Sequence, residues 1–552
     1  MLTRREFHKG LVGFALASIA TRQSVKAETP PEDEATFFLN RLTYGATRQS
    51  RSEFREAGLE NWLNTQLSLP ARDPALEDRI RSTRLLIEYE AGRTEDGETW
   101  PALSEHRPIS LLDKDPADLL YLLDFDKPIA FSERERPANE VIAASLVRAV
   151  HATAQLREVM TAFWHEHFSV NALKSELTAV FFPEYDRGMR ENAFGNFRRL
   201  LGHVAKSPSM LAYLNNDESR ASPANENYAR ELMELHTLGA ENYFNDKYQN
   251  WKDVPGVKAG LAEGYIEQDV YEVARALTGW SIGDGRELDE NTYAPETGRF
   301  AYFESWHDPY QKRVLGRELP ANSAPLKDGE TVLDILAAHP GTAHFVSGKL
   351  LRALGVEAPS STYLGAIAKV FHDARDAEDQ IAQTIRAIVL HSEYTATPAG
   401  KLRRPFEFVA ALFRATEAQV SPRSDAIYWE LARAGWTQHQ VRPPTGHSDR
   451  TRDWANTHAI SGTVSLALGA HAEWMDASDP VLRRLPETVT VYQDLAHYWG
   501  DRFGLPAPDM QALFDLYDID PDEEIDPDPD SVEWINEAMV AALSLTPEFL
   551  FR

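Results

Sequence analysis

Apolar residues recur at helical spacing along most of this 552-residue chain, and no stretch shows the extended alternation typical of a β-strand. In the segment Asn225–Gly239, Tyr228, Leu232 and Leu235 share one face at 3.6 residues per turn. Asn225 is a favourable N-cap residue and Gly239 a favourable C-cap residue, so we expect one helix here. The chain is therefore predicted to be mainly α: a large multi-helix orthogonal bundle with long irregular loops and at most a small β-hairpin region, within residues 281–330.

The length allows two or three domains or one large one. We expect a signal peptide over residues 1–27, an N-terminal helical region over 28–130, a central helical core over 131–420 and a C-terminal helical region over 421–552. The last region contains an acidic Pro-Asp run, Asp518–Asp530. This run lacks the glycine and the terminal glutamate of an EF-hand loop, so it predicts a solvated linker rather than a calcium site.

The charge and the absence of cysteine exclude several classes of function. The formal net charge is −28, whereas a surface that binds nucleic-acid phosphates has to be basic, so we expect no nucleic-acid partner. The lack of cysteine excludes disulfides, thiolate zinc sites and a cysteine nucleophile together. Any metal ion must be held by His, Asp, Glu, Asn or backbone oxygens.

The first residues have the pattern of a twin-arginine export signal. Arg4 and Arg5 precede Phe7 and Lys9, an apolar run follows, and a small-residue cleavage site lies at Val25-Lys26-Ala27. No later segment is long and apolar enough to cross a bilayer, so no membrane span is expected in the mature chain. The protein is predicted to be periplasmic or secreted; the alternative is a chance Arg-Arg pair before a frayed helix.

The motif Trp164–Phe168 (W-H-E-H-F) ends a long periodic stretch that begins at Glu140. If the helix ends near Trp164, the imidazoles of His165 and His167 can turn toward one divalent metal ion, and Glu226, Glu231 or Asn227 can supply a carboxylate or amide ligand, with Glu226 as the predicted one. If the helix continues, the two rings diverge and only one can reach the ion. The alternative is a helix end whose histidines are hydrogen-bonded to backbone or carboxylate groups.

The polar face of the segment Asn225–Gly239 supplies candidate catalytic residues. Asn227, Arg230 and Glu231 lie on this face, and a half-buried Glu231 would have a raised pKa suited to a general base. In the competing interpretation, Glu226 and Arg230 form an ordinary i, i+4 surface ion pair.

His307 and Asp308, with Lys312 nearby, lie in the least helical part of the chain, where functional residues concentrate. They are further catalytic candidates, although neighbouring side chains in a chain seldom face each other.

Several stretches together resemble a large family of uncharacterised bacterial proteins, catalogued as domain of unknown function 1800. The resemblance implies a helical exported protein, often encoded beside a second exported family that would be its partner. The Pro-rich block near Trp436 is followed by Gly446-His447-Ser448-Asp449, where the resemblance leads us to expect Gly-Trp. The matching blocks are Phe38–Thr47, Trp164–Val170, Asn225–Gly239, Tyr265–Trp280, His307-Asp308 with Lys312 and Gly316, His339–Ala343 and Pro405–Ala415.

Two functions follow from these features. The first is an exported hydrolase of a cell-surface or environmental polymer, dependent on a metal or a carboxylate, with His165, His167, Glu226 and Glu231 around an ion or a water. The second is a non-catalytic scaffold that binds a polymer, such as a carbohydrate, or a co-exported protein, with the aromatic residues of 243–251 as its contact surface. The two differ in whether these polar groups converge in one concave pocket.

Overall fold

The computed structural model describes residues 33–552 except 290, 423–424, 475–481, 483–484, 506–510, 512–513 and 516–518. The predicted signal peptide over residues 1–27 lies outside the described residues. Helices dominate and every sheet among the described residues is a small antiparallel pair, so the predicted mainly α fold is confirmed.

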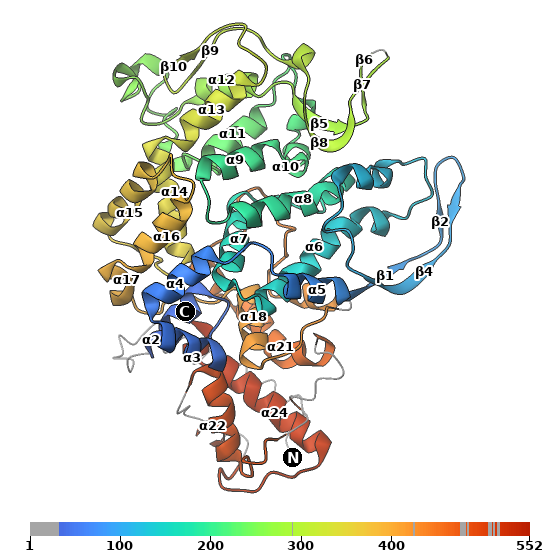
Figure 1. Ribbon diagram of the computed structural model, residues 1–552, viewed down its shortest axis with the longest axis vertical. Helices are drawn as coiled ribbons and strands as arrows, with labels where there is room; N and C mark the ends of the chain where they lie inside the picture. The colour runs from blue at the N-terminus through green and yellow to red at the C-terminus, as the bar shows by residue number, and fades with distance from the viewer. Residues whose placement is uncertain are drawn as a thin grey trace.

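The N-terminal region begins with four short helices, α2 (Glu34–Leu42), α3 (Arg48–Ala57), α4 (Leu59–Ser68) and α5 (Pro74–Ser82). A two-stranded ribbon of β1 (Arg84–Tyr89) and β4 (Leu103–Pro108) follows, with β2 (Gly92–Arg93) and β3 (Thr99–Trp100) towards its tip. The region predicted to be helical over 28–130 thus contains a hairpin that projects from the side of the molecule (Figure 1). Its outer face is largely exposed, so the sequence carries little apolar alternation.

The centre of the molecule is a group of packed helices, seen in Figure 1 around α7. The predicted periodic stretch from Glu140 to Phe168 is two helices, because the chain turns at Ala152–Ala154. The Gln155 side-chain amide donates to the carbonyls of Ala149 and Ala152 at 3.0 Å. These bonds supply hydrogen-bond donors to carbonyl groups at the C-terminal end of the first helix. The elements are η1 (Pro116–Leu123), α6 (Phe131–His151), α7 (Gln155–His167), α8 (Glu176–Asn192), α9 (Phe197–Lys206), α10 (Pro208–Tyr213) and η2 (Asn216–Glu218).

The predicted helix over Asn225–Gly239 is α11 (Glu226–Glu234), capped by the Asn225 side chain, which accepts from the N–H groups of Asn227 and Tyr228. It ends five residues before Gly239, and turns continue to that glycine, whose φ is +88°. After it come η3 (Ala240–Asn242), η4 (Trp251–Asp253), η5 (Val257–Ala259) and α12 (Glu267–Ala276).

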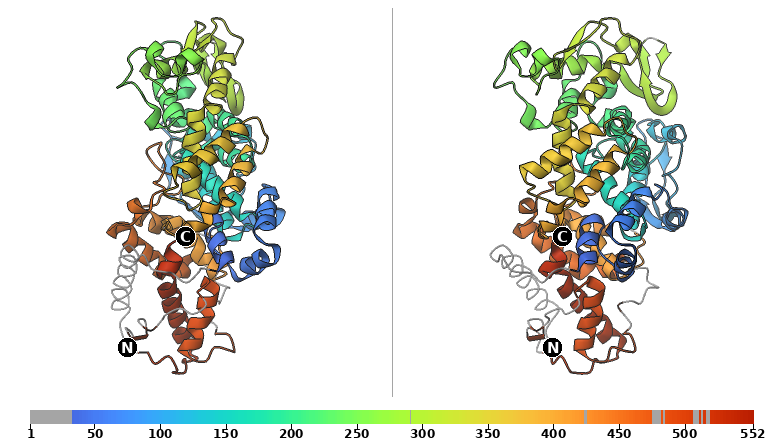
Figure 2. Two further views of the ribbon diagram at one scale, coloured as in Figure 1. Left: turned by 90° about the vertical axis from the view of Figure 1, so that its left-hand side faces the viewer. Right: turned by 60° about the vertical axis from the view of Figure 1, so that its left-hand side comes forward.

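The predicted hairpin region is present within and just before residues 281–330. The small sheets pair β5 (Trp280–Asp284) with β8 (Glu296–Tyr302), β6 (Glu287–Asp289) with β7 (Thr292–Tyr293), and β9 (Lys312–Val314) with β10 (Arg317–Leu319); η6 (Glu304–Trp306) lies between them. They form one end of the elongated molecule (Figures 1 and 2).

The remaining chain is helical and returns to the centre. Its elements are α13 (Lys327–Ala337), α14 (Pro340–Ala353), α15 (Ser361–Asp373), α16 (Gln380–Val389), α17 (Ser392–Ala396), α18 (Pro405–Ala415), α19 (Ala426–Arg433), α20 (Thr451–Trp454), α21 (Thr457–Trp474), α22 (Tyr492–Phe503), α24 (Pro529–Ser544) and α25 (Pro547–Leu550).

Buried apolar side chains form two large clusters, one drawn mainly from residues 35–394 and the other mainly from residues 402–551. The last residues join the two: Arg552 and Lys401 exchange backbone hydrogen bonds, and Arg403 donates to the Leu550 carbonyl at 2.8 Å. The C-terminus therefore lies beside α2 at the middle of the molecule (Figure 1), next to a cavity that Arg552 helps to line. The predicted division at residue 420 stays a prediction.

Candidate functional site

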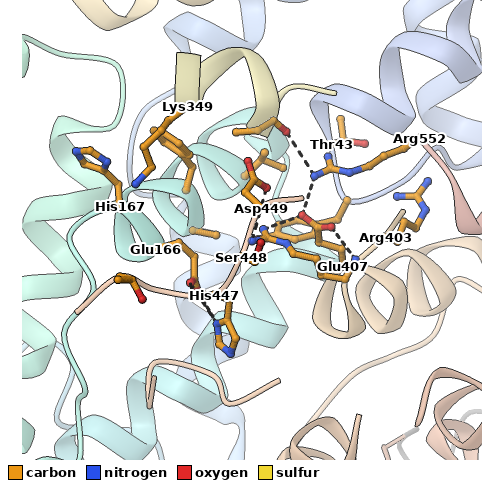
Figure 3. A pocket seen from close by; sticks show the side chains of 17 residues that line it. Thr43, Glu166, His167, Lys349, Arg403, Glu407, His447, Ser448, Asp449 and Arg552 are labelled. Carbon is orange, nitrogen blue, oxygen red and sulfur yellow. Dashed lines mark hydrogen bonds and ion pairs between the residues drawn. The ribbon is translucent and has the colours of Figure 1, made fainter. Parts of the chain in front are cut away.

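A cavity of about 170 Å³ lies where α7, α14, the start of α18, the segment 445–449 and the C-terminal residue meet (Figure 3). Its charged lining is three carboxylates, Glu166, Glu407 and Asp449, and four cations, Lys349, Arg403, Arg404 and Arg552. His167 and His447 add two imidazoles, and Tyr44, Val159 and Phe163 part of the apolar wall. In a chain with a net charge of −28, a lining with one more cation than carboxylates is a local departure from the overall acidity.

One wall is a buried ion cluster at the start of α18. Pro405 occupies the first turn of this helix, and the Glu407 carboxylate accepts the Arg404 N–H at 3.0 Å, as in a capping box. Glu407 also accepts from the Arg404 and Arg552 guanidinium groups at 2.9 and 2.7 Å. Burial alone would raise the pKa of Glu407, but these two cations hold it well below its usual range. The wall is therefore charged at neutral pH and internally paired.

The opposite wall is held by Glu166, the carboxylate between the two histidines of the α7 motif. Its Oε2 accepts the backbone N–H of His447 at 2.7 Å, and the His447 ring Nδ1 lies 3.2 Å from both of its oxygens. Burial opposes ionisation, yet the contacts with His447 and the charge of Arg404 lower the pKa of Glu166 to about 2. Glu166 thus fastens the segment 445–449 across the cavity.

Gly446 allows this contact, because its φ is +70° and a Cβ there would lie 2.3 Å from the Glu166 carbonyl oxygen. The next residue, His447, stacks on Trp436 with ring centroids 4.0 Å apart and an interplanar angle of 9°. The imidazole thus stands at the position where the family resemblance led us to expect tryptophan.

Lys349 is a cation of the cavity for which the described residues supply no carboxylate within ion-pair distance. It extends from α14, and its Nζ lies 5.5 Å from the centroid of the Phe345 ring. Among the described residues, no hydrogen bond or ion pair engages its ammonium group. Burial and the charge of Arg352 lower its pKa to about 8, although Asp449 and Glu166 act in the other direction.

His167 lies beside Lys349 (Figure 3). Its Nε2 is 3.1 Å from the His236 carbonyl oxygen, which can only accept, so Nε2 carries the proton. The other nitrogen, Nδ1, is buried and has no partner among the described groups. Burial and the nearby Lys349 keep the pKa of His167 well below its ordinary value, so the ring is a neutral acceptor at its Nδ1 atom.

The predicted metal ligands are not brought together. α7 continues to His167, so the His165 ring points elsewhere: its Nε2 lies 3.1 Å from Asp186, and its ring is 4.4 Å from that of His439. Asp186 is in turn paired with Arg190. Glu226 is exposed at the start of α11. Over the described residues, no group of three or more His, Asp or Glu side chains is arranged to hold a metal ion.

The predicted catalytic residues of α11 lie apart from the cavity lining. Asn227 is exposed, and Arg230 pairs with Glu267, which also accepts from the Tyr243 hydroxyl at 2.8 Å. The surface pair expected between Glu226 and Arg230 is thus replaced by a contact with α12. Glu231 is half-buried, and burial, followed by the nearby Glu234, raises its pKa.

His307 and Asp308 face different partners. The His307 ring Nδ1 lies 2.9 Å from the Thr278 carbonyl and its Nε2 lies 3.3 Å from Asp328. Asp308 accepts two bonds from Arg275, at 2.8 and 3.0 Å. The buried Lys312 donates to Asp328 at 2.7 Å. These contacts fasten an irregular segment to α12 and α13.

The aromatic residues expected to form a contact surface, Tyr243, Phe244, Tyr248 and Trp251, are partly buried and pack against the larger apolar cluster. Trp251 also lies under the Arg313 guanidinium, 3.8 Å from its ring centroid. These four aromatic residues therefore contribute to the packing of the apolar core.

Sequence reasoning missed most of the cavity. Lys349 belongs to no motif, and Arg552 is the last residue of the chain. The sequence does contain a usable signal, because the blocks Phe38–Thr47, Trp164–Val170 and Pro405–Ala415 each supply residues to the lining of this cavity.

Comparison with known proteins identifies the family. A family model described as "Protein of unknown function (DUF1800)" matches residues 37–551, and the chain belongs to this family. No curated protein and no solved structure matches the chain. Across the described residues, no helix has the length and apolar character needed to cross a membrane.

Proposed function

From its membership of the DUF1800 family and its central cavity, we propose that this protein is exported by the twin-arginine route and binds a small anionic group outside the cytoplasmic membrane. The ligand is a small molecule or the end of a polymer that carries a carboxylate, sulfate or phosphate. The size of the cavity, about 170 Å³, suits such a group better than several residues of a polymer chain.

The observation that carries this proposal is the unpaired Lys349. The carboxylates of the cavity are each engaged: Glu166 with His447, Glu407 with Arg404 and Arg552, and Asp449 with Lys401. A cation left without a counter-ion in a partly enclosed, low-dielectric hollow favours an anion from solution. The lining as a whole has four cations and three carboxylates, so Lys349 leaves it with an excess of one positive charge.

Calorimetric titration with sulfate tests the proposal, because the charge of sulfate is constant over the relevant pH range. We expect saturable binding to the wild-type protein at pH 7 and at least a tenfold loss of affinity in Lys349→Met. Lys369→Met is the matched control, since Lys369 is 74% exposed on α15 and pairs with Asp373. Equal affinity of Lys349→Met and the wild type, or no binding to either, contradicts the proposal.

Hydrolysis of a cell-surface or environmental polymer is a second candidate function. The half-buried Glu231 favours it, because a carboxyl group with a raised pKa is suited to proton transfer. We expect the wild type to release reducing sugars or amines from cell-wall polymers. We expect Glu231→Gln to lose this activity while its fold stays intact. Equal release by both proteins removes Glu231 from the reaction.

A further inference from the structure

The two sides of the cavity differ in chemistry. Lys349 and His167 lie on one side, and Arg403 and Arg552 on the other (Figure 3). On the arginine side, the Nε atoms of Arg404 and Arg552 are buried donors without a partner among the described groups. On the lysine side, the amine of Lys349 has no counter-ion among the described residues. The neutral imidazole of His167 lies on the same side, and its Nδ1 has no hydrogen-bond partner among them. A ligand with two different functional groups fits this arrangement.

We propose that Lys349 is a nucleophilic amine that joins a carbonyl-bearing anion, of the 2-oxo acid class, as an imine. The inference rests on the proposed anion-binding function and deepens it. In the anion complex the arginine side and protonated Lys349 hold the carboxylate together, and when Lys349 has lost its proton the arginine side keeps the carboxylate while the carbonyl carbon lies toward the amine. Arginine is suited to the first task because its planar guanidinium recognises carboxylates, and lysine to the second because its amine loses a proton readily when buried.

The surroundings of Lys349 raise the fraction of its side chain that is unprotonated. Arg352 on the same helix repels a second positive charge, and burial disfavours the ammonium form. With a pKa of about 8, roughly a tenth of the amine is unprotonated at pH 7. The carboxylates of Asp449, Glu166 and Glu241 act in the opposite direction and raise the pKa of Lys349.

The step balances without an oxidant or another reactant. The Lys349 nitrogen forms a bond to the carbonyl carbon, the electron pair of the C=O π bond moves to the oxygen, and one of the two amine protons passes to that oxygen to give the carbinolamine. The second nitrogen proton is then transferred to the hydroxyl group, which leaves as water while the nitrogen electron pair forms the C=N bond. His167 lines the same cavity, and we assign its Nδ1, which carries a lone pair and has no partner among the described groups, as the base that relays a proton from the nitrogen.

Reductive trapping tests the inference. The full mature chain is incubated with pyruvate and sodium cyanoborohydride at pH 7.5, digested and analysed by mass spectrometry. We expect Lys349 to gain the reduced pyruvate adduct on the order of tenfold faster than the exposed Lys369, and excess sulfate to slow the reaction at Lys349 alone. Labelling of Lys349 no faster than Lys369 overturns the proposal, and this comparison needs no variant.

A charge-conserving variant separates this inference from the proposed function. Lys349→Arg keeps a cation in the cavity but lacks an amine, so we expect sulfate binding to persist and trapping at this position to be lost. If the wild type binds sulfate but Lys349 is not trapped faster than Lys369, the imine proposal is wrong and the proposed anion binding is still supported. Absence of both sulfate binding and preferential trapping overturns the two together.

Discussion

The Glu166 carboxylate accepts the backbone N–H of His447 at 2.7 Å, although the two residues are 281 positions apart in the chain. This contact fixes one wall of the cavity, because His447 is followed directly by Ser448 and Asp449, which also line it. An ionised carboxylate that accepts a backbone N–H makes a charge-assisted contact, which is stronger than a hydrogen bond between neutral groups.

The free energy of unfolding of the protein should depend on pH because of the Glu166 carboxyl group. Its pKa in the folded protein, about 2, is below the ordinary 4.5, so its stabilising effect is complete above about pH 4.5 and is lost as the pH falls toward 2. We expect Glu166→Gln to lower the free energy of unfolding by about 3 kcal/mol at pH 7, and the difference from wild type to shrink below pH 4.5. Urea unfolding at pH 7, 5 and 3 measures this. The exposed Glu56→Gln on α3 is the control, and a difference that is constant with pH contradicts the account.

Gly446 should tolerate no side chain. In Gly446→Ala the Cβ meets the Glu166 backbone at a left-handed φ of +70°, so we expect a loss of about 1–3 kcal/mol in stability. Gly365→Ala on α15 has nothing within 4 Å of its Cβ and no unusual φ, so the same substitution there should stabilise by about 0.4–1 kcal/mol. Thermal and urea unfolding report both values, and equal effects at the two glycines disprove the close approach.

His165 should matter for stability but not for ligand binding. Its ring contacts Asp186 in a buried group with Arg190, so His165→Ala should cost about 1–3 kcal/mol. Sulfate affinity should stay within twofold of the wild type, since His165 is not part of the cavity lining. If the His165→Ala protein is folded but no longer binds sulfate, this prediction is wrong and His165 takes part in ligand binding.

The main features of the fold could be predicted from the sequence, because helical periodicity and caps are local signals. Asn225 caps α11 as expected, and small hairpins lie near residues 281–330. The cavity could not be predicted in the same way. The α7 motif singles out His165 and His167, yet Glu166 between them holds the facing segment, and only the packing of that segment determines this. Lys349, Glu407 and Arg552 meet through tertiary contacts that no spacing encodes.

Export should depend on the paired arginines of the signal predicted over residues 1–27. Replacement of both in Arg4→Lys, Arg5→Lys should leave the full-length chain in the cytoplasm, because the twin-arginine route recognises the pair. Cell fractionation with immunoblotting gives the result, and Lys26→Arg near the cleavage site is the control. Export of the double variant at the wild-type level contradicts the proposed route.

The pH dependence of sulfate affinity tests the central claim most directly. Lys349 must carry its proton to bind an anion, so wild-type affinity should be full below its pKa of about 8 and fall as the pH rises through that value. Lys401, whose pKa is lowered to about 8 by burial, also titrates here, but it is unchanged in Lys349→Arg. We predict that the wild type loses affinity at least tenfold between pH 7 and pH 9.5, while Lys349→Arg keeps it. Superimposable pH profiles for the two proteins would contradict the assignment of Lys349 as the anion-binding group.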